Sequence, residues 1–244
     1  MIGLVTMNKD VIVKELNLLF PNPKCELEYS NDYELLLSVM LSAQTTDKRV
    51  NIVTKDLYNK YNSLEKLNSL SEYELNEYLK SIGFHKTKSK YFKNIVNVLL
   101  KIGYVPNDRN FLESLPGVGR KTASVVLGIL FDEPSFAVDT HVFRTSKRLG
   151  ITNDKDDILR TEIKLKKYFD KSMWNRVNSQ MVLFGRYYCT SKNPKCDNCN
   201  LKSICKRKWI MENISNIFND EVNVDELLDY ILECEGELEN EFEN

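Results

Sequence analysis

Four cysteines near the carboxyl end of the sequence have the spacing of a metal site. Cys189, Cys196, Cys199 and Cys205 follow the pattern C-x6-C-x2-C-x5-C. A structural zinc site usually pairs two short C-x2–4-C knuckles, and only the step from Cys196 to Cys199 has that length. Four thiolates in one tight loop suit an iron–sulfur cluster better. The spacing therefore favours a [4Fe–4S] cluster, with zinc as the alternative, and the bound group would fold a loop too polar to fold alone.

A glycine hairpin in the middle of the chain could bind an anion. Gly117 and Gly119 flank Val118, so the turn can adopt positive φ angles and bring its backbone close to another molecule. Arg120 then opens an apolar helix, whose first turn presents unpaired N–H groups and the positive end of the helix dipole. The pattern predicts a phosphate site, although an ordinary hairpin between two helices can have the same glycine spacing.

Two ionisable residues follow this turn and could take part in a reaction. Lys121 lies in the first turn of the new helix, and Asp139 precedes a helical pattern that starts at Thr140, where it would cap the helix. A capping carboxylate accepts backbone N–H bonds and stays ionised, which suits a site where a cation forms. The alternatives are a solvated surface lysine and an aspartate that only caps.

These segments resemble the helix-hairpin-helix DNA glycosylases of the endonuclease III type. The similarity lies in LPGVGRKTA, which contains Lys121, in VDTHVFR, which contains Asp139, and in the cysteine spacing. It covers about residues 8–208. The resemblance implies that Lys121 is an amine nucleophile, that Asp139 is the essential carboxylate, and that the four cysteines bind a [4Fe–4S] cluster.

The resemblance also implies an activity, that of a base excision repair enzyme with DNA glycosylase and AP lyase functions. Attack of the lysine on C1′ would release the base and leave a Schiff base, and β-elimination would nick the strand 3′ to the abasic site. The family's usual substrates are oxidised pyrimidines, and the partner would be double-stranded DNA with a damaged base or an abasic site. A monofunctional mismatch glycosylase and a non-catalytic DNA-binding module are the alternatives.

Further residues are expected to contact DNA, because an enzyme that acts on a base must take it out of the stack. By resemblance, Gln44 would fill the vacated space and Phe84 would wedge the opposite strand. A helix-capping turn and an aromatic core residue are the alternative interpretations. The other expected DNA contacts are His85, the hairpin residues Gly117, Val118, Gly119 and Arg120, and the two lysines between the first cysteines, Lys192 and Lys195.

The charge of the chain is unevenly distributed. The net charge is −1, but 12 of the 35 acidic residues lie in 211–244, which contains no Lys or Arg. Residues 1–210 therefore carry 34 basic and 23 acidic residues, a net charge of +11 that is typical of a nucleic-acid-binding body. The acidic tail is predicted to be partly helical or disordered. It would be a solubilising extension, or it would compete with DNA.

Neither a membrane span nor a secretory signal is apparent in the sequence. No apolar run approaches the ~18 residues of a span, and the segment MIGLVTMNKD has no basic region before its apolar residues. We therefore expect an intracellular monomer without membrane contact. It would act in the cytoplasm or nucleoid of a prokaryote, or in the nucleus or mitochondrion of a eukaryote.

Helices must position all of these residues, since no pattern of alternating strands occurs. Apolar periodicity and capping residues predict an all-α fold with helices over about 8–20, 32–41, 47–61, 71–83, 86–100, 108–115, 120–130, 140–149, 156–169 and 173–184. Phe184, where relatives often have histidine, is interpreted as a core residue. The resemblance adds a six-helix barrel with the hairpin (25–135), an iron–sulfur domain (1–24 and 136–210), and a DNA cleft between these two domains.

Overall fold

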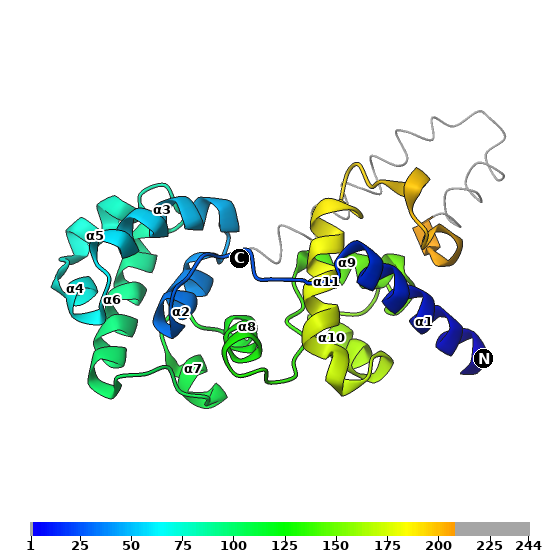
Figure 1. Cartoon of the computed structure of the whole chain (residues 1–244), viewed down its shortest axis with the longest axis horizontal. Helices are drawn as coiled ribbons and strands as arrows, with labels where there is room; N and C mark the ends of the chain where they lie inside the picture. The colour runs from blue at the N-terminus through cyan, green and yellow to red at the C-terminus, as the bar shows by residue number, and fades with distance from the viewer. Residues whose placement is uncertain (1, 208–244) are drawn as a thin grey trace. The chain divides into compact units, whose positions relative to one another are not determined.

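Helices joined by loops make up residues 2–207, which are the residues described by the computed structural model of the protein, with side chains from residue 8 onward. No strand occurs in this part of the chain, and the predicted all-α fold is confirmed (Figure 1). None of the helices within it has both the length and the apolar character needed to cross a membrane. The acidic tail predicted over 211–244 lies outside the described residues.

The described residues form two compact units. Cys25–Ser135 is one unit, called the hairpin unit below. The other unit, called the cysteine unit, combines the described residues of 1–24 with those of 136–244. Each unit has its own apolar core, so each is described by itself.

The hairpin unit is built around a buried helix. Its elements are α2 (Asp32–Leu41), α3 (Asp47–Lys60), α4 (Leu64–Ser69), α5 (Glu72–Leu79), α6 (His85–Ile102), α7 (Arg109–Ser114) and α8 (Arg120–Leu130). Every residue of α2 from Glu34 to Leu41 is buried, and the helix contacts α3, α6 and α8. The strongly apolar segment therefore occupies the centre of this unit.

Side-chain caps mark the starts of most of these helices, and α6 and α8 are the exceptions. The hydroxyl of Thr46 accepts the amide of Arg49 at the start of α3, and Ser71 forms a complete capping box with Glu74 at the start of α5. The sequence predicts that the helix after Ser71 continues to Gly83, but it ends at Leu79. The sequence also failed to predict the short helix α4.

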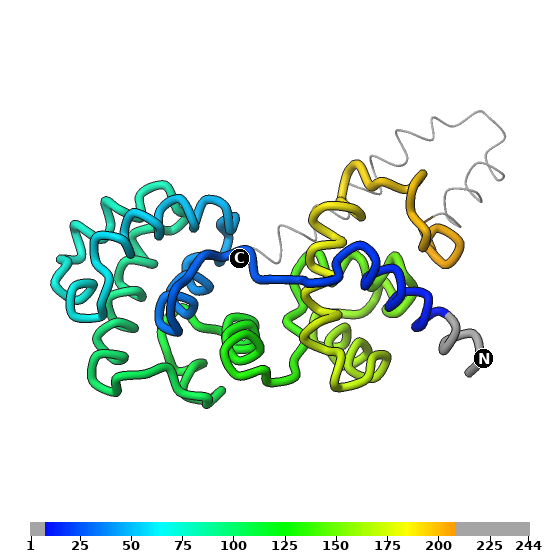
Figure 2. Tube along the Cα trace, viewed as in Figure 1, coloured from blue at the N-terminus to red at the C-terminus, as the bar shows by residue number. Residues whose placement is uncertain are grey.

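The cysteine unit joins segments far apart in the sequence. It contains α1 (Ile2–Leu19), α9 (Thr140–Arg148), α10 (Ile158–Tyr168), η1 (Lys171–Met173), α11 (Trp174–Tyr187), η2 (Cys196–Asn198) and η3 (Lys202–Ile204). Helix α1 packs beside α11 (Figure 2). The amide of Gln180 donates to the carbonyls of Leu16 and Phe20, which fixes the end of α1. Phe184 is 1% exposed and stacks on Tyr188, so its prediction as a core residue is confirmed.

Candidate functional site

The glycine hairpin is a tight turn between α7 and α8. Gly117 has φ 78°, and a Cβ atom there would lie 2.5 Å from Cδ2 of Tyr91, so the turn needs glycine for both conformation and space. Val118 is buried, and its amide donates to the carbonyl of Leu115 at 3.1 Å. It therefore contributes to the turn itself, and its side chain does not face solvent. Gly119 is the N-cap of α8 and provides no side-chain cap, so the amides of the first turn of α8 have no cap side chain over them.

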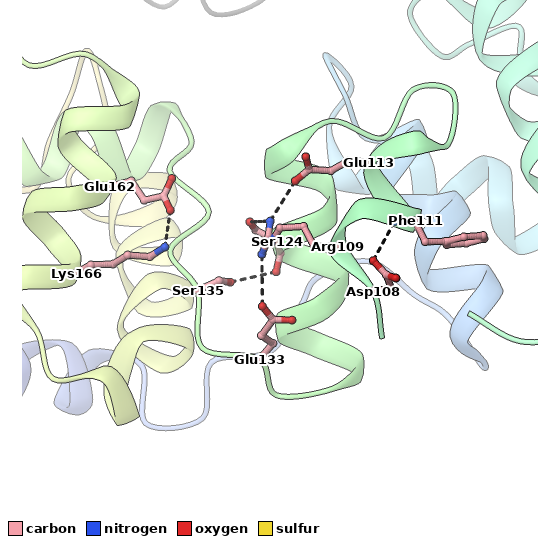
Figure 3. Close-up of polar contacts among 9 residues, drawn as sticks. All are labelled: Asp108, Arg109, Phe111, Glu113, Ser124, Glu133, Ser135, Glu162 and Lys166. Carbon is pink, nitrogen blue, oxygen red and sulfur yellow. Dashed lines mark hydrogen bonds and ion pairs between the residues drawn. The ribbon is translucent and has the colours of Figure 1, made fainter. Parts of the chain in front are cut away.

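Lys121 is exposed in that first turn of α8. The helix behind it is fixed by Arg109 at the start of α7, whose Nη1 donates to Oγ of Ser124 at 3.1 Å (Figure 3). The same guanidinium pairs with Glu113 at 3.3 Å and with Glu133 at 3.8 Å. Arg109 thereby ties both helices of the hairpin and the segment after α8 into one rigid support for the lysine.

Asp139 belongs to the cysteine unit, so it and Lys121 are carried by different units. Its Oδ1 accepts the amide of Val142 at 2.7 Å, which confirms the predicted N-cap of α9. The residue is half-buried. Helix α9 packs closely against α11. The two helices approach so closely at Gly185 that a Cβ atom added there would lie 2.7 Å from Cβ of His141. The carboxylate is therefore held at the end of a well-packed helix.

The two predicted DNA-probing loops touch each other within the hairpin unit. Gln44 and Phe84 are both exposed, and both have positive φ, 53° and 57°. A Cβ atom at Gly83 would lie 3.3 Å from the carbonyl oxygen of Gln44, so the loops meet at this glycine. His85 is anchored at Nδ1 by Oδ1 of Asn76, 2.7 Å away. The core alternative for Phe84 is wrong, since 66% of its side chain is exposed.

A buried lysine that the sequence did not reveal lies beneath these loops. Nζ of Lys88 donates to the carbonyls of Leu41 and Ala43 at 3.0 and 2.5 Å, and to Oγ1 of Thr45 at 3.1 Å. Burial lowers the pKa of Lys88 to about 8. Two of its three acceptors are backbone carbonyls, which every residue has. No sequence pattern could therefore have indicated that Lys88 binds this loop.

The four predicted metal-ligating cysteines line one cavity. This cavity has a volume of about 680 Å³, and its wall includes Cys189, Cys196, Cys199 and Cys205. Within the described residues, no three Cys, His, Asp or Glu side chains converge tightly enough to hold a single metal ion. The thiols instead surround a space. Burial raises the pKa of Cys199, and repulsion from Cys189 and Cys205 adds to the rise. A group that supplies positive charge to several thiolates would relieve this repulsion.

Two buried arginines of α9 hold the start of the cysteine loop, Cys189–Cys205. Arg144 donates from Nη2 to the carbonyl of Gly185 at 2.9 Å and to that of Cys189 at 3.3 Å. Arg148 donates to the carbonyls of Thr190 and Ser191 at 2.7 and 3.1 Å, and its Nη1 lies 3.5 Å from Sγ of Cys189. Helix α9 thus carries Asp139 at one end and supports the cysteine loop along its length. Sequence reasoning missed both arginines.

Basic side chains line the same cavity. Lys192 and Lys195 are exposed residues of its wall, as the prediction of phosphate contacts requires, and Lys202 and Arg207 line it too. The cysteine loop is also joined to α1, because the side-chain amide of Asn200 donates to both carboxylate oxygens of the buried Glu15. The loop therefore has a fixed inner side and a basic outer side.

Comparison with known proteins decides the family. A model of the HhH-GPD superfamily of base excision DNA repair proteins matches residues 37–171. The chain is 44% identical over 190 residues to endonuclease III of Bacillus subtilis, which covers 77% of the chain and 87% of that relative. It is 42% identical over 208 residues to endonuclease III of Buchnera aphidicola subsp. Schizaphis graminum, with 82% and 98% covered.

The chain belongs to the HhH-GPD superfamily. Its relatives identify it as a base excision DNA repair enzyme of the endonuclease III type, a DNA glycosylase and AP lyase. Among solved structures, a trapped endonuclease III–DNA covalent intermediate matches with a TM-score of 0.78 and 40% identity, over 84% of this chain and 96% of that one. A thermostable thymine-DNA glycosylase, 20% identical with a TM-score of 0.70, shares the fold. The HhH-GPD fold thus accounts for the hairpin, its flanking helices and the all-α architecture.

Proposed function

We propose that this HhH-GPD enzyme removes oxidised pyrimidines from double-stranded DNA and then nicks the strand, with Lys121 as the nucleophile. The observation that carries the proposal is an exposed lysine in the first turn of α8, directly after the hairpin. A closely similar relative has been solved as a covalent intermediate with DNA. A lyase of this kind needs an amine that can reach the sugar, and Lys121 is positioned to present one.

The reaction proceeds in two steps. In the first, the lone pair of the neutral Lys121 amine forms a bond to C1′, the base leaves with the electron pair of the glycosidic bond, and the proton that the amine loses neutralises the departing base. Opening of the sugar gives a Schiff base between Lys121 and C1′. In the second step, a proton leaves C2′, its electrons form the C2′–C3′ double bond, and the 3′ phosphate departs. Hydrolysis of the Schiff base returns the free lysine.

Asp139 is the carboxylate that supports these steps. Its Oδ1 is engaged by the amide of Val142, which fixes the carboxylate at the start of α9. A negative charge stabilises the cationic sugar of the transition state, and a carboxylate can also relay protons. Because the cap holds Asp139 through the backbone, its position does not depend on a flexible side-chain partner.

The hairpin holds the DNA backbone for this chemistry. The uncapped amides at the start of α8 and the positive end of the helix dipole favour a phosphate there. Gly117, Gly119 and Arg120 are the contact residues, and Val118 contributes only its backbone. Phosphate contacts fix the position of the protein on the duplex and carry no sequence information.

The cysteine loop would bind a [4Fe–4S] cluster through its four cysteines. The donor set and the cavity that all four thiols line support this assignment over a single zinc ion. When bound, the cluster supplies ligation that takes the place of an apolar core in the loop. The folded loop would then present the exposed Lys192 and Lys195 to DNA phosphates.

Borohydride trapping tests the proposal. Wild type, Lys121→Gln and Asp139→Asn are mixed with duplex DNA that carries one thymine glycol or one abasic site, and the reduced covalent adduct is quantified. We expect an adduct with wild type, none with Lys121→Gln, and a loss of about 100-fold with Asp139→Asn. Release of a base without an adduct would indicate a monofunctional glycosylase. Binding without release or adduct would indicate a non-catalytic module.

A further inference from the structure

The two DNA-probing loops have an unusual backbone at their tips. Gln44 and Phe84 are two of the three non-glycine residues with positive φ in the described part of the chain. Side chains other than glycine rarely adopt this region, because Cβ approaches the following carbonyl. Such a conformation persists only where the surrounding structure enforces it. Both tips therefore need a nearby group that holds them.

Lys88 is connected to both tips. Its side chain donates to the carbonyl of Ala43, just before Gln44, and to the hydroxyl of Thr45, just after it. Its backbone amide donates to the carbonyl of Phe84 at 3.0 Å. The side chain of Lys88 thus binds the turn on both sides of Gln44, whereas the bond to Phe84 is a backbone bond of α6 that other residues would also make.

A cation is costly at this position, and helix stability does not explain its presence. The Nζ partners of Lys88 are two carbonyls and one hydroxyl, so the buried ammonium has dipoles around it and no carboxylate among them. Lys88 also lies in the first turn of α6, where the helix dipole disfavours a positive charge. Its compensation lies at the other end of the contact, because the carbonyls of Leu41 and Ala43 lie at the end of α2 and just beyond it, where a cation is favoured, and binding them fixes the turn that carries Gln44.

A second lysine on α6 shows what the same chemistry does away from the loops. Nζ of Lys93 donates to the carbonyls of Asn68 and Leu70, the latter at 2.5 Å, and burial lowers its pKa too. Its acceptors lie in the last turn of α4 and at the residue that caps it, so this lysine holds the end of α4. Lys93 contacts neither probing loop. It is therefore a matched control for a buried lysine that donates to backbone carbonyls.

We propose that Lys88 is a positioning residue that holds Gln44 in its inserting conformation directly, and Phe84 through the contact of the two loops at Gly83, so that this protein extrudes a damaged base from an intact duplex. The inference rests on the proposed function, because it assigns the loops to base extrusion. It also separates two activities. Excision of a paired base requires both tips, whereas reaction at a preformed abasic site, where no base has to be extruded, depends on them much less.

The test compares Lys88→Met with Lys93→Met in the full-length protein. Two single-turnover rates are measured for each variant: excision of thymine glycol from a duplex, and covalent trapping on a preformed abasic site. We expect Lys88→Met to slow excision at least about tenfold, because a small misplacement of a positioning group costs that much or more, and to change trapping less than about twofold. Lys93→Met should leave both rates within about twofold of wild type.

Several outcomes would overturn the inference. Equal slowing of both reactions by Lys88→Met would indicate a general structural defect, and an unchanged excision rate would show that the loops do not need Lys88. If Lys88→Met does not fold, Lys88→Gln, whose shorter side chain has two donors and cannot reach all three acceptors, must show the same selective loss. Wild type that neither excises nor traps would refute the proposed function itself, which is a different result.

Discussion

The hairpin unit and the cysteine unit position their functional residues by different means. In the hairpin unit, one continuous apolar core supports seven helices, and the hairpin and the probing loops lie where those helices begin and end. In the cysteine unit, the loop from Cys189 to Cys205 contributes one fully buried apolar side chain, Leu201. Charged side chains of α9 hold the loop instead, together with the proposed cluster. The comparison indicates that apolar packing suffices where functional residues lie at helix ends, and that this irregular loop is held by polar contacts from neighbouring helices.

Because polar contacts hold the cysteine loop, we expect the largest loss of stability on substitution of Arg148. We expect Arg148→Met to lose about 4 kcal/mol of local stability in the cysteine loop, because two carbonyls are left without a charged donor in a buried site. The rate of thiol labelling at the cysteines measures this opening. Arg176→Met, which removes an exposed bond to the carbonyl of Pro21, is the control. Equal labelling of both variants would contradict the role of α9.

In the hairpin unit, Gly117 should be the position where a substitution lowers the unfolding free energy most. Gly117→Ala forces an alanine into positive φ and onto the ring of Tyr91, and we expect a loss of about 3 kcal/mol of unfolding free energy together with weaker DNA binding. Gly119→Ala has open space and φ −88°, so it should cost less than about 1 kcal/mol. Denaturant unfolding measures both. Similar losses in the two variants would show that the packing at Gly117 is not decisive.

The pH dependence of stability reports on Lys88. Its pKa is lowered from 10.5 to about 8 in the folded protein, so between these pH values the unfolded chain binds more protons than the folded one. The destabilising cost of burying the ammonium is therefore full below pH 8 and is relieved as pH rises toward 10.5. Relative to Lys88→Met, wild type should gain about 2 to 3 kcal/mol over that range. A difference between the two unfolding free energies that does not vary with pH would show that the ammonium is not buried.

The smallest predicted effect is at a helix cap remote from both sites. Ser71→Ala removes the capping box of α5 and should cost about 1 kcal/mol of unfolding free energy. Borohydride trapping should be unchanged, because the apolar core of the hairpin unit holds the functional helix ends independently of this cap. A large loss of trapping with the small loss of stability would show that the hairpin unit is more finely coupled than its packing suggests.

Local signals in the sequence predicted the helices and their caps, and they failed where contacts join distant segments. Thr46, Ser71 and Asp139 were predictable as caps, since the cap and the amide it accepts lie within one turn. The end of α5 was not, because Gly83 is used for close approach to the carbonyl of Gln44 and not to end a helix. Lys88 and Arg148 donate to carbonyls 47 and 42 residues away in sequence, and a carbonyl acceptor cannot be recognised from the type of the residue that carries it. The cysteine spacing was informative because residues close together along one loop can line one cavity, as these four do.

The central claim is that the amine of Lys121 forms the covalent bond to DNA. The most direct test is to reduce the complex of wild-type protein and abasic-site duplex with borohydride, digest it with protease and nuclease, and locate the sugar remnant by mass spectrometry. We predict a single modified peptide with the remnant on Lys121. A remnant on any other amine, or a trapped yield that persists in Lys121→Gln, would contradict the account.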